Sequence, residues 1–77
     1  MSRNRYQIYI EILSICQIPN NKMRIVYKCN LNFTIIRKYL NTLIIHKYIS
    51  EENNKYLTTE TGIVVLNKLI EINEMLS

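Results

Sequence analysis

The 77-residue sequence has no Ala, Asp or Trp and only one Gly, one Pro and one His. Without Asp and with a single His, it lacks the side chains that acid–base or covalent catalysis needs, and a single Gly cannot build a glycine-rich phosphate loop. Two cysteines and one histidine are too few ligands for a tetrahedral zinc site. We therefore expect no enzyme, no metal or other cofactor, and no small-molecule substrate.

Long apolar runs are also missing. The longest covers residues 63–66, far short of the roughly 20 residues of a membrane-spanning helix, and no signal-peptide core opens the chain. Apolar residues still make up 48% of the sequence and charged residues 21%, as in a folded domain. We expect one cytoplasmic domain over residues 1–77 with no membrane partner. Cys16 and Cys29 are predicted to be small buried core residues in a reducing compartment.

Positive charge is concentrated in the first part of the chain. Residues 1–47 contain eight Lys or Arg and one Glu, a balance of +7, whereas residues 48–77 contain two Lys and five Glu, a balance of −3. An unspecialised surface rarely separates charge to this extent in so short a chain. The asymmetry predicts that the first part meets a polyanion, of which nucleic acid is the main candidate.

Residue spacing predicts three helices before residue 47. The first covers residues 3–17 and ends before Pro19; its apolar positions recur at three- and four-residue steps, namely Tyr6, Tyr9, Ile12, Leu13 and Cys16. The second covers residues 22–28, with Ile25, Val26 and Cys29 facing inward. The third is capped by Asn32 and runs from Phe33 to about His46. Its predicted inward side chains are Ile35, Tyr39, Leu40 and Leu43, and its predicted outward ones are Thr34, Arg37, Lys38 and Asn41.

Beyond residue 47 the pattern changes to strands and a last helix. Residues 48–51 and 55–58 are rich in strand formers, and the Asn53-Asn54 pair between them tolerates a tight turn, so we expect a β-hairpin. Thr59 is predicted to cap a helix that reaches nearly to Ser77. This helix is too apolar for one small core, because nine of its last fifteen residues are apolar.

That excess predicts a homodimer through residues 59–77. Spacings of four, three and four residues, typical of a coiled coil, join Val65, Leu69, Ile72 and Leu76, which are the expected dimer interface. The neighbouring stripe of Ile63, Leu66 and Ile70 is expected to face the chain's own core. The alternative is a monomer in which the last helix is broadly buried.

Several segments of the sequence resemble those of a known protein family. The segment 24–33, RIVYKCNLNF, followed by Lys38-Tyr39-Leu40 and Leu43, is similar to the signature of small archaeal winged helix-turn-helix proteins. Residues 6–16 resemble the first helix of that family, and its hairpin-to-helix junction is matched by Tyr56, Thr59, Glu60 and Gly62. Met23 stands where relatives often have a capping Thr, which moves the expected cap of the second helix to Asn21. Lys47 replaces a Gly common at the end of the third helix.

The resemblance implies an α+β winged helix that binds double-stranded DNA, either as a transcription regulator or as a protein of the ten-kilodalton chromatin-associated type. It places the third helix, about residues 32–46, in the major groove. The expected DNA-binding residues come from the second and third helices and the hairpin, and they are Lys22, Arg24, Lys28, Asn32, Thr34, Arg37, Lys38, Asn41, Asn54 and Lys55. Arg3 and Arg5 are expected to add phosphate contacts. On the second helix, Arg24, Tyr27 and Lys28 are expected near the surface. The rings of Tyr27 and Tyr39 are expected to pack on the core with their hydroxyls at its rim, and the alternative for both is a stacking or phosphate contact with DNA. The alternative function is a protein-interaction module that does not bind DNA.

Overall fold

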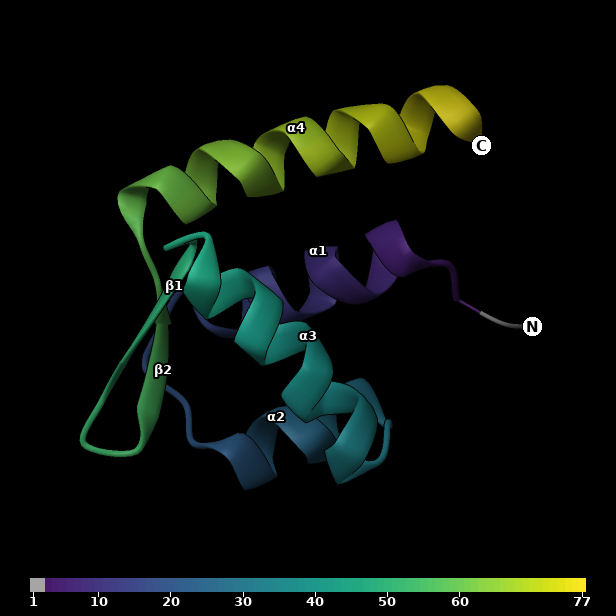
Figure 1. The fold of residues 1–77 in the computed structure, drawn as a ribbon. Coiled ribbons are helices and arrows are strands. Elements are labelled where there is room, and N and C mark those ends of the chain that lie inside the picture. The colour runs from purple at the N-terminus through teal and green to yellow at the C-terminus, as the bar shows by residue number, and fades with distance from the viewer. Residues whose placement is uncertain (1–2) are drawn as a thin grey trace.

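A computed structural model describes residues 3–77. Its elements are α1 (Arg5–Ile15), α2 (Lys22–Cys29), α3 (Phe33–Ile45), β1 (Ile49–Glu52), β2 (Lys55–Thr58) and α4 (Glu60–Leu76) (Figure 1). The predicted order of elements is confirmed, and each boundary lies within two residues of its predicted place. No helix in the described part of the chain is both long and apolar enough to cross a membrane.

Side-chain caps fix where the helices start. Asn4, Asn21, Asn32 and Thr59 each accept a hydrogen bond from the backbone N–H three residues ahead, which satisfies one of the otherwise unpaired donors of the first turn. The predicted caps at Asn21, Asn32 and Thr59 are thereby confirmed. Lys47, which follows the end of α3, has a φ of 64°, in the left-handed region that Gly adopts more easily.

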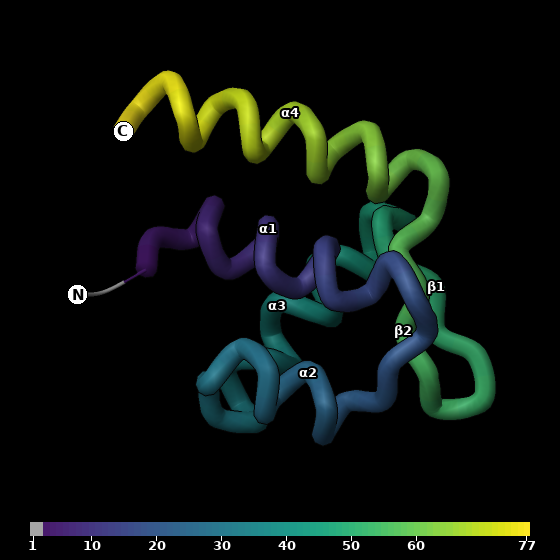
Figure 2. Tube along the Cα trace, turned by 180° about the vertical axis from the view of Figure 1, so that it is seen from behind, coloured from purple at the N-terminus to yellow at the C-terminus, as the bar shows by residue number. Residues whose placement is uncertain are grey.

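The helices enclose one core. In the two opposite views, α4 runs antiparallel along α1, while α2 and α3 lie on the other side of α1 and the hairpin closes one end (Figures 1 and 2). The fully buried side chains come from the first three helices and β1, and they are Ile12, Leu13, Cys16, Ile25, Cys29, Ile36, Leu40 and Ile49. Leu66 is the principal contribution of α4 to this core.

Three predicted core positions are wrong. On α1 the side chain of Tyr6 is 43% exposed, and Ile8 is buried instead. On α3 the buried row is Ile36, Leu40 and Leu43, while Ile35 is exposed. On α4, Ile70 is exposed, whereas Val65 and Leu69 pack partly against the core. The other predicted core positions on these faces include Leu13, Leu40 and Leu66, which are buried as expected.

The hairpin is fastened to the rest of the chain at its base. β1 and β2 pair antiparallel with Ile49 opposite Thr58, and both turn residues, Asn53 and Asn54, have positive φ, as a two-residue turn requires. The buried Asn20 extends this pairing, because its backbone exchanges both hydrogen bonds with Tyr56 at 2.8 and 3.1 Å. Thr58 donates its hydroxyl to the Leu13 carbonyl at 2.8 Å. The segment before α2 therefore acts as a short third strand.

A tight joint connects α3, β1 and α4. The Thr59 hydroxyl donates to the Lys47 carbonyl at 2.8 Å and accepts the Gly62 N–H at 3.0 Å. The Tyr48 carbonyl accepts the Thr59 N–H and lies so close to Gly62 that a Cβ there would be 2.1 Å from its oxygen. The absence of a side chain at position 62 lets the first turn of α4 pack directly on the backbone before β1.

The two cysteines are buried free thiols, as predicted. Burial raises the pKa of Cys16 to about 12 and that of Cys29 to about 11, from an ordinary value of 9.0. The unfolded chain therefore loses these protons first as pH rises. The two thiols therefore leave the free energy of unfolding unchanged below about pH 9. As pH rises toward 11, that free energy falls by up to about 1.4 kcal/mol per pH unit for each thiol.

Urea unfolding at several pH values between about 8 and 11 measures this loss. The variant Cys16→Ala, Cys29→Ala is less stable at every pH, because it leaves two small cavities, but its stability is expected to change less with pH than that of the wild type. Equal pH slopes for the two proteins would contradict a protonated, buried state of the thiols.

Candidate nucleic-acid interface

α2 and α3 are joined by a short turn that presents α3 outward. Asn30 ends α2 in the left-handed conformation, with a φ of 53° and a ψ of 44°. Two residues later, the Asn32 side-chain oxygen accepts the Ile35 N–H at 2.9 Å. That oxygen is committed to the cap, so only the amide NH₂ of Asn32 is left to donate to a ligand. The two helices thus form a compact helix-turn-helix whose geometry is set by two asparagines.

The outward face of α3 is exposed and basic. All four side chains predicted to face outward are exposed, namely Thr34, Arg37, Lys38 and Asn41. Arg37 and Asn41 are one helical turn apart on one side, as are Thr34 and Lys38 on the adjacent side. Residues 22–46 contain five Lys or Arg and no acidic residue, so this surface carries uncompensated positive charge.

On one side of α3, the first helix contributes a further cation. Arg5 and Lys38 line a shallow groove of about 200 Å³ between α1 and α3, whose floor contains Tyr9 and Tyr39. The two tyrosine rings pack edge to face, with centroids 4.8 Å apart, which confirms the predicted burial of Tyr39. Arg3, in contrast, pairs with Glu11 at 2.6 Å. Arg5 is therefore the better placed of the two N-terminal arginines to contact a polyanion beside α3.

On the other side of α3, a second groove separates the helix-turn-helix from the hairpin. It has a volume of about 280 Å³, and its lining includes Lys22, Phe33, Glu51, Asn54 and Tyr56. The Lys22 ammonium lies 4.9 Å from the centre of the Phe33 ring and 6.0 Å from that of Tyr56, within cation–π range of both. Burial, helped by the neighbouring Glu51 carboxylate, raises the pKa of Tyr56, so its phenol stays neutral.

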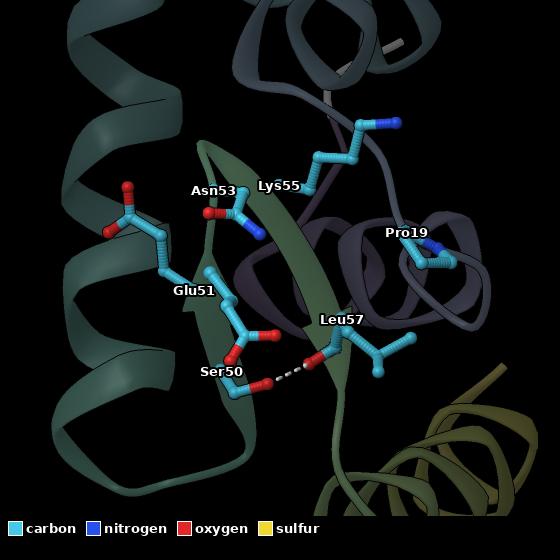
Figure 3. Close-up of a pocket in the computed structure, with 7 residues that line it drawn as sticks. Pro19, Ser50, Glu51, Asn53, Lys55 and Leu57 are labelled. Carbon is cyan, nitrogen blue, oxygen red and sulfur yellow. Dashed lines mark hydrogen bonds between the residues drawn. The ribbon is translucent and has the colours of Figure 1, made fainter.

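The two candidate DNA-binding residues at the hairpin tip, Asn54 and Lys55, line different hollows. Asn54 lines the groove beside α2 and α3, whereas Lys55 lines a hollow of about 440 Å³ on the Pro19 side of the hairpin (Figure 3). The lining of this hollow also includes Glu51 and Glu52. The hairpin therefore carries two carboxylates beside one ammonium, and the positive charge of this surface lies on α2 and α3.

The outward-facing side chains of α2 are exposed to solvent. Arg24 and Lys28 are exposed one turn apart, consistent with a shared outward face. Tyr27 is 84% exposed, so its expected position near the surface is confirmed and the expected packing of its ring on the core is wrong. Ile25 and Cys29 are the buried side chains of this short helix, and Val26 packs partly against the same core.

A separate apolar groove lies between α1, the end of α3 and α4. Its volume is about 300 Å³, and it is lined by Arg5, Tyr6, Tyr9, Thr42, Leu43, His46, Tyr48, Val65 and Leu69. His46 is the C-cap residue of α3, and its ring stacks on Tyr48 with centroids 5.6 Å apart. Further along α4, Ile72 and Leu76 are 42% and 72% exposed. Of the four predicted dimer residues, the first two therefore contact the chain's own core and the last two face solvent.

Residues 2–77 match the sequence profile of a protein family whose description is winged helix-turn-helix. This chain belongs to the winged helix-turn-helix family. In the terms of this family, α2 and α3 are the helix-turn-helix, α3 holds the position called the recognition helix, and the β1–β2 hairpin is the wing. The α+β winged-helix fold predicted from the sequence is thereby confirmed.

Two archaeal proteins are similar to this chain, one in sequence and one in structure. An uncharacterized protein of Methanocaldococcus jannaschii, MJ0287, is 30% identical over 76 residues, which cover 97% of this chain and 78% of the relative. The crystal structure of Sso10a-2, a DNA-binding protein from Sulfolobus solfataricus, superposes with a TM-score of 0.83 at 26% identity. The match covers 95% of this winged helix and 81% of Sso10a-2. The predicted resemblance to small archaeal winged-helix proteins is confirmed.

Proposed function

We propose that this protein binds double-stranded DNA with α3 in the major groove, as a transcription regulator or a chromatin-associated protein. The observation that carries the proposal is the exposed face of α3, which presents Arg37, Lys38 and Asn41 in a segment with five cations and no carboxylate. The family and the DNA-binding character of Sso10a-2 support the same function.

Each side chain on this face has a role that follows from its chemistry. The planar fork of Arg37 fits O6 and N7 of guanine, the amide of Asn41 fits N6 and N7 of adenine, and Thr34 suits a phosphate or a thymine methyl. Lys38 is a phosphate contact, because a single flexible ammonium carries little geometric information.

The flanking residues hold the backbone of the duplex. Lys22, Arg24 and Lys28 on α2 are the remaining phosphate contacts, and the NH₂ group of Asn32 is a fourth donor beside them. At the wing, Asn54 faces the recognition helix and Lys55 extends from the opposite side of the hairpin, where each meets the backbone or the minor groove. Arg5 adds a cation on the α1 side of the recognition helix.

Fluorescence anisotropy of a mixed-sequence duplex, titrated with the protein at several salt concentrations, tests this function. Lys22, Arg24, Lys28 and Lys38 make four phosphate contacts, so the logarithm of the affinity should fall against the logarithm of salt with a slope of about −3 to −4 for each protomer bound. The slope is steeper where Arg5 and Lys55 also contact phosphates. Competition between duplexes of different sequence then separates the two roles, because a regulator discriminates among them and a chromatin protein does so only weakly.

Absence of binding at low salt would overturn the proposal. It would favour the alternative function, a protein-interaction module, for which the apolar groove between α1, α3 and α4 is the specific supporting observation. A mainly apolar protein interface would also show little dependence on salt.

We also propose that the protein is a homodimer through α4. The apolar stripe of Val65, Leu69, Ile72 and Leu76 begins against the core of its own chain, but its second half continues beyond that cover and leaves Ile72 and Leu76 exposed. Pairing with the same stripe of a second copy would remove this apolar surface from water.

The double variant Ile72→Glu, Leu76→Glu is expected to convert the dimer to a monomer, because it places four carboxylates in the apolar seam of the pair. Sedimentation velocity measures the change. Both positions are exposed in the protomer, so the fold should survive, as thermal unfolding will verify. The control is Val64→Glu, an exposed apolar position outside the stripe. A wild-type protein that sediments as a monomer would contradict the proposal.

A further inference from the structure

Phe33 is a large apolar side chain left half in solvent. It is the first residue of α3 and is 42% exposed, although the core beneath α3 is already filled by Ile36, Leu40 and Leu43. An aromatic ring has no hydrogen-bonding group with which to hold water. Its position therefore favours a ligand that offers an apolar surface.

Lys22 makes a cation–π contact with this ring. Its ammonium lies 4.9 Å from the ring centre, and the same ammonium reaches Tyr56 of the hairpin at 6.0 Å. One cation thus connects the starts of α2 and α3 to β2 through two rings. This contact restricts the ring, so ordering it against a ligand costs less conformational entropy than ordering a phenylalanine with no neighbour.

Phe33 also belongs to the row that faces the DNA in the proposed function. Arg37 is one helical turn after Phe33, and Asn41 is one turn after Arg37, so the three side chains follow each other along one side of α3. The N-terminal residues of a recognition helix are those that contact base edges. Phe33 is the first member of the row and the nearest to the wing groove that it lines with Asn54.

We propose that Phe33 contacts the 5-methyl group of thymine and gives the protein a preference for A·T pairs at one position of its site. Thymine is the one base whose major-groove edge carries an apolar group, and phenylalanine is one of the side chains that contact it. The inference rests on the proposed function, because it requires α3 in the major groove. Arg37 and Asn41 cannot distinguish thymine from its counterpart without the methyl group, since their polar groups pair with guanine and adenine edges.

The test compares two duplexes that differ only in that methyl group. One is an alternating A·T duplex, in which every pair carries one thymine methyl, and the other has deoxyuridine at every thymine. Burial of one methyl group corresponds to about a fourfold change in affinity. Wild-type protein should bind the thymine duplex about three- to fourfold more tightly by anisotropy, and Phe33→Ala should bind both duplexes equally.

Two further variants keep the result specific to Phe33. Ile45→Ala removes an exposed apolar side chain from the other end of the same helix and should keep the wild-type preference. Phe33→Leu, which retains apolar surface, should keep part of it and guards against a folding defect in the alanine variant.

The outcomes separate the two proposals. Equal wild-type affinity for the two duplexes, or an unchanged preference in Phe33→Ala, would overturn the role of Phe33 while leaving DNA binding intact. Failure to bind either duplex at low salt would overturn the proposed function itself, and the inference with it.

Discussion

Replacement of Arg37 and Lys38 together by alanine is expected to weaken duplex binding by about 30-fold or more. Loss of a bidentate Arg contact to guanine costs about 1–3 kcal/mol, and loss of a phosphate-bound Lys lowers the salt slope by about one. Both side chains are exposed, so their removal should leave the fold unchanged. Anisotropy titrations at two salt concentrations measure affinity and slope together.

The control must change the net charge equally without touching α3. Lys68→Glu on α4 does so, because it lowers the charge by two at an exposed position outside the helix-turn-helix. It should weaken binding only slightly through the general field of the protein. If the control and the double variant weaken binding to the same extent, α3 is not the recognition helix and the binding is a nonspecific effect of charge.

Gly62→Ala is expected to destabilise the fold by about 2 kcal/mol or more. Alanine is favoured over glycine in a helix interior by about 1 kcal/mol, but the added Cβ would lie 2.1 Å from the Tyr48 carbonyl oxygen and 2.7 Å from Cγ2 of Thr58. A backbone carbonyl cannot turn aside as a side chain can, so the first turn of α4 must shift. For a domain of this size the melting temperature should fall by roughly 10 °C.

A second substitution distinguishes which of the two contacts matters. Thr58→Ser removes the Cγ2 atom but keeps the hydroxyl that donates to Leu13, so it relieves only the milder clash. Added to Gly62→Ala, it should restore little of the lost stability. Thr61→Ala, an exposed neighbour, should change stability by less than about 0.5 kcal/mol. A melting temperature of Gly62→Ala within a few degrees of wild type would contradict the close approach at this joint.

The order and bounds of the elements followed from local signals in the sequence. Asn21, Asn32 and Thr59 act through a hydrogen bond within three residues of themselves, and the Asn53-Asn54 turn acts through the conformations of two residues. Such features depend on few neighbours, so a single sequence is enough to predict them.

The rotation of each helix about its axis was harder to predict. α1 has an isoleucine at positions 8, 10, 12 and 15, so more than one face is apolar enough to turn inward. Which face is buried depends on where α4 lies, and that is a contact between opposite ends of the chain. On α3 the adjacent pair Ile35 and Ile36 presents the same ambiguity, since each begins a row of apolar side chains at helical spacing.

At the candidate interface, too, the features within one element were predictable and the contacts between elements were not. The exposure of Arg37, Lys38 and Asn41 was predictable, because polar side chains on the outward side of an amphipathic helix stay in water. The position of Arg5 beside Lys38 and the contact of Lys22 with Phe33 and Tyr56 join separate elements, and no spacing within one element encodes them. The helix spacing placed Tyr27 near the surface, and the expected packing of its ring on the core was wrong because hydrophobicity alone assigns an aromatic residue to a core.

The fastening of the hairpin to Leu13, Cys16 and Asn20 bears on how the chain folds. The Thr58 hydroxyl and amide bond to carbonyls more than forty residues earlier, and Tyr56 pairs with Asn20. Closing such long loops lowers the entropy of the chain before the contacts they allow have formed. This raises the barrier to folding, so folding should be slower than in a helical bundle of equal length. During synthesis, the first three helices would leave the ribosome with the far side of α1 uncovered. They would depend on the arrival of the hairpin and α4 before they hold a stable structure.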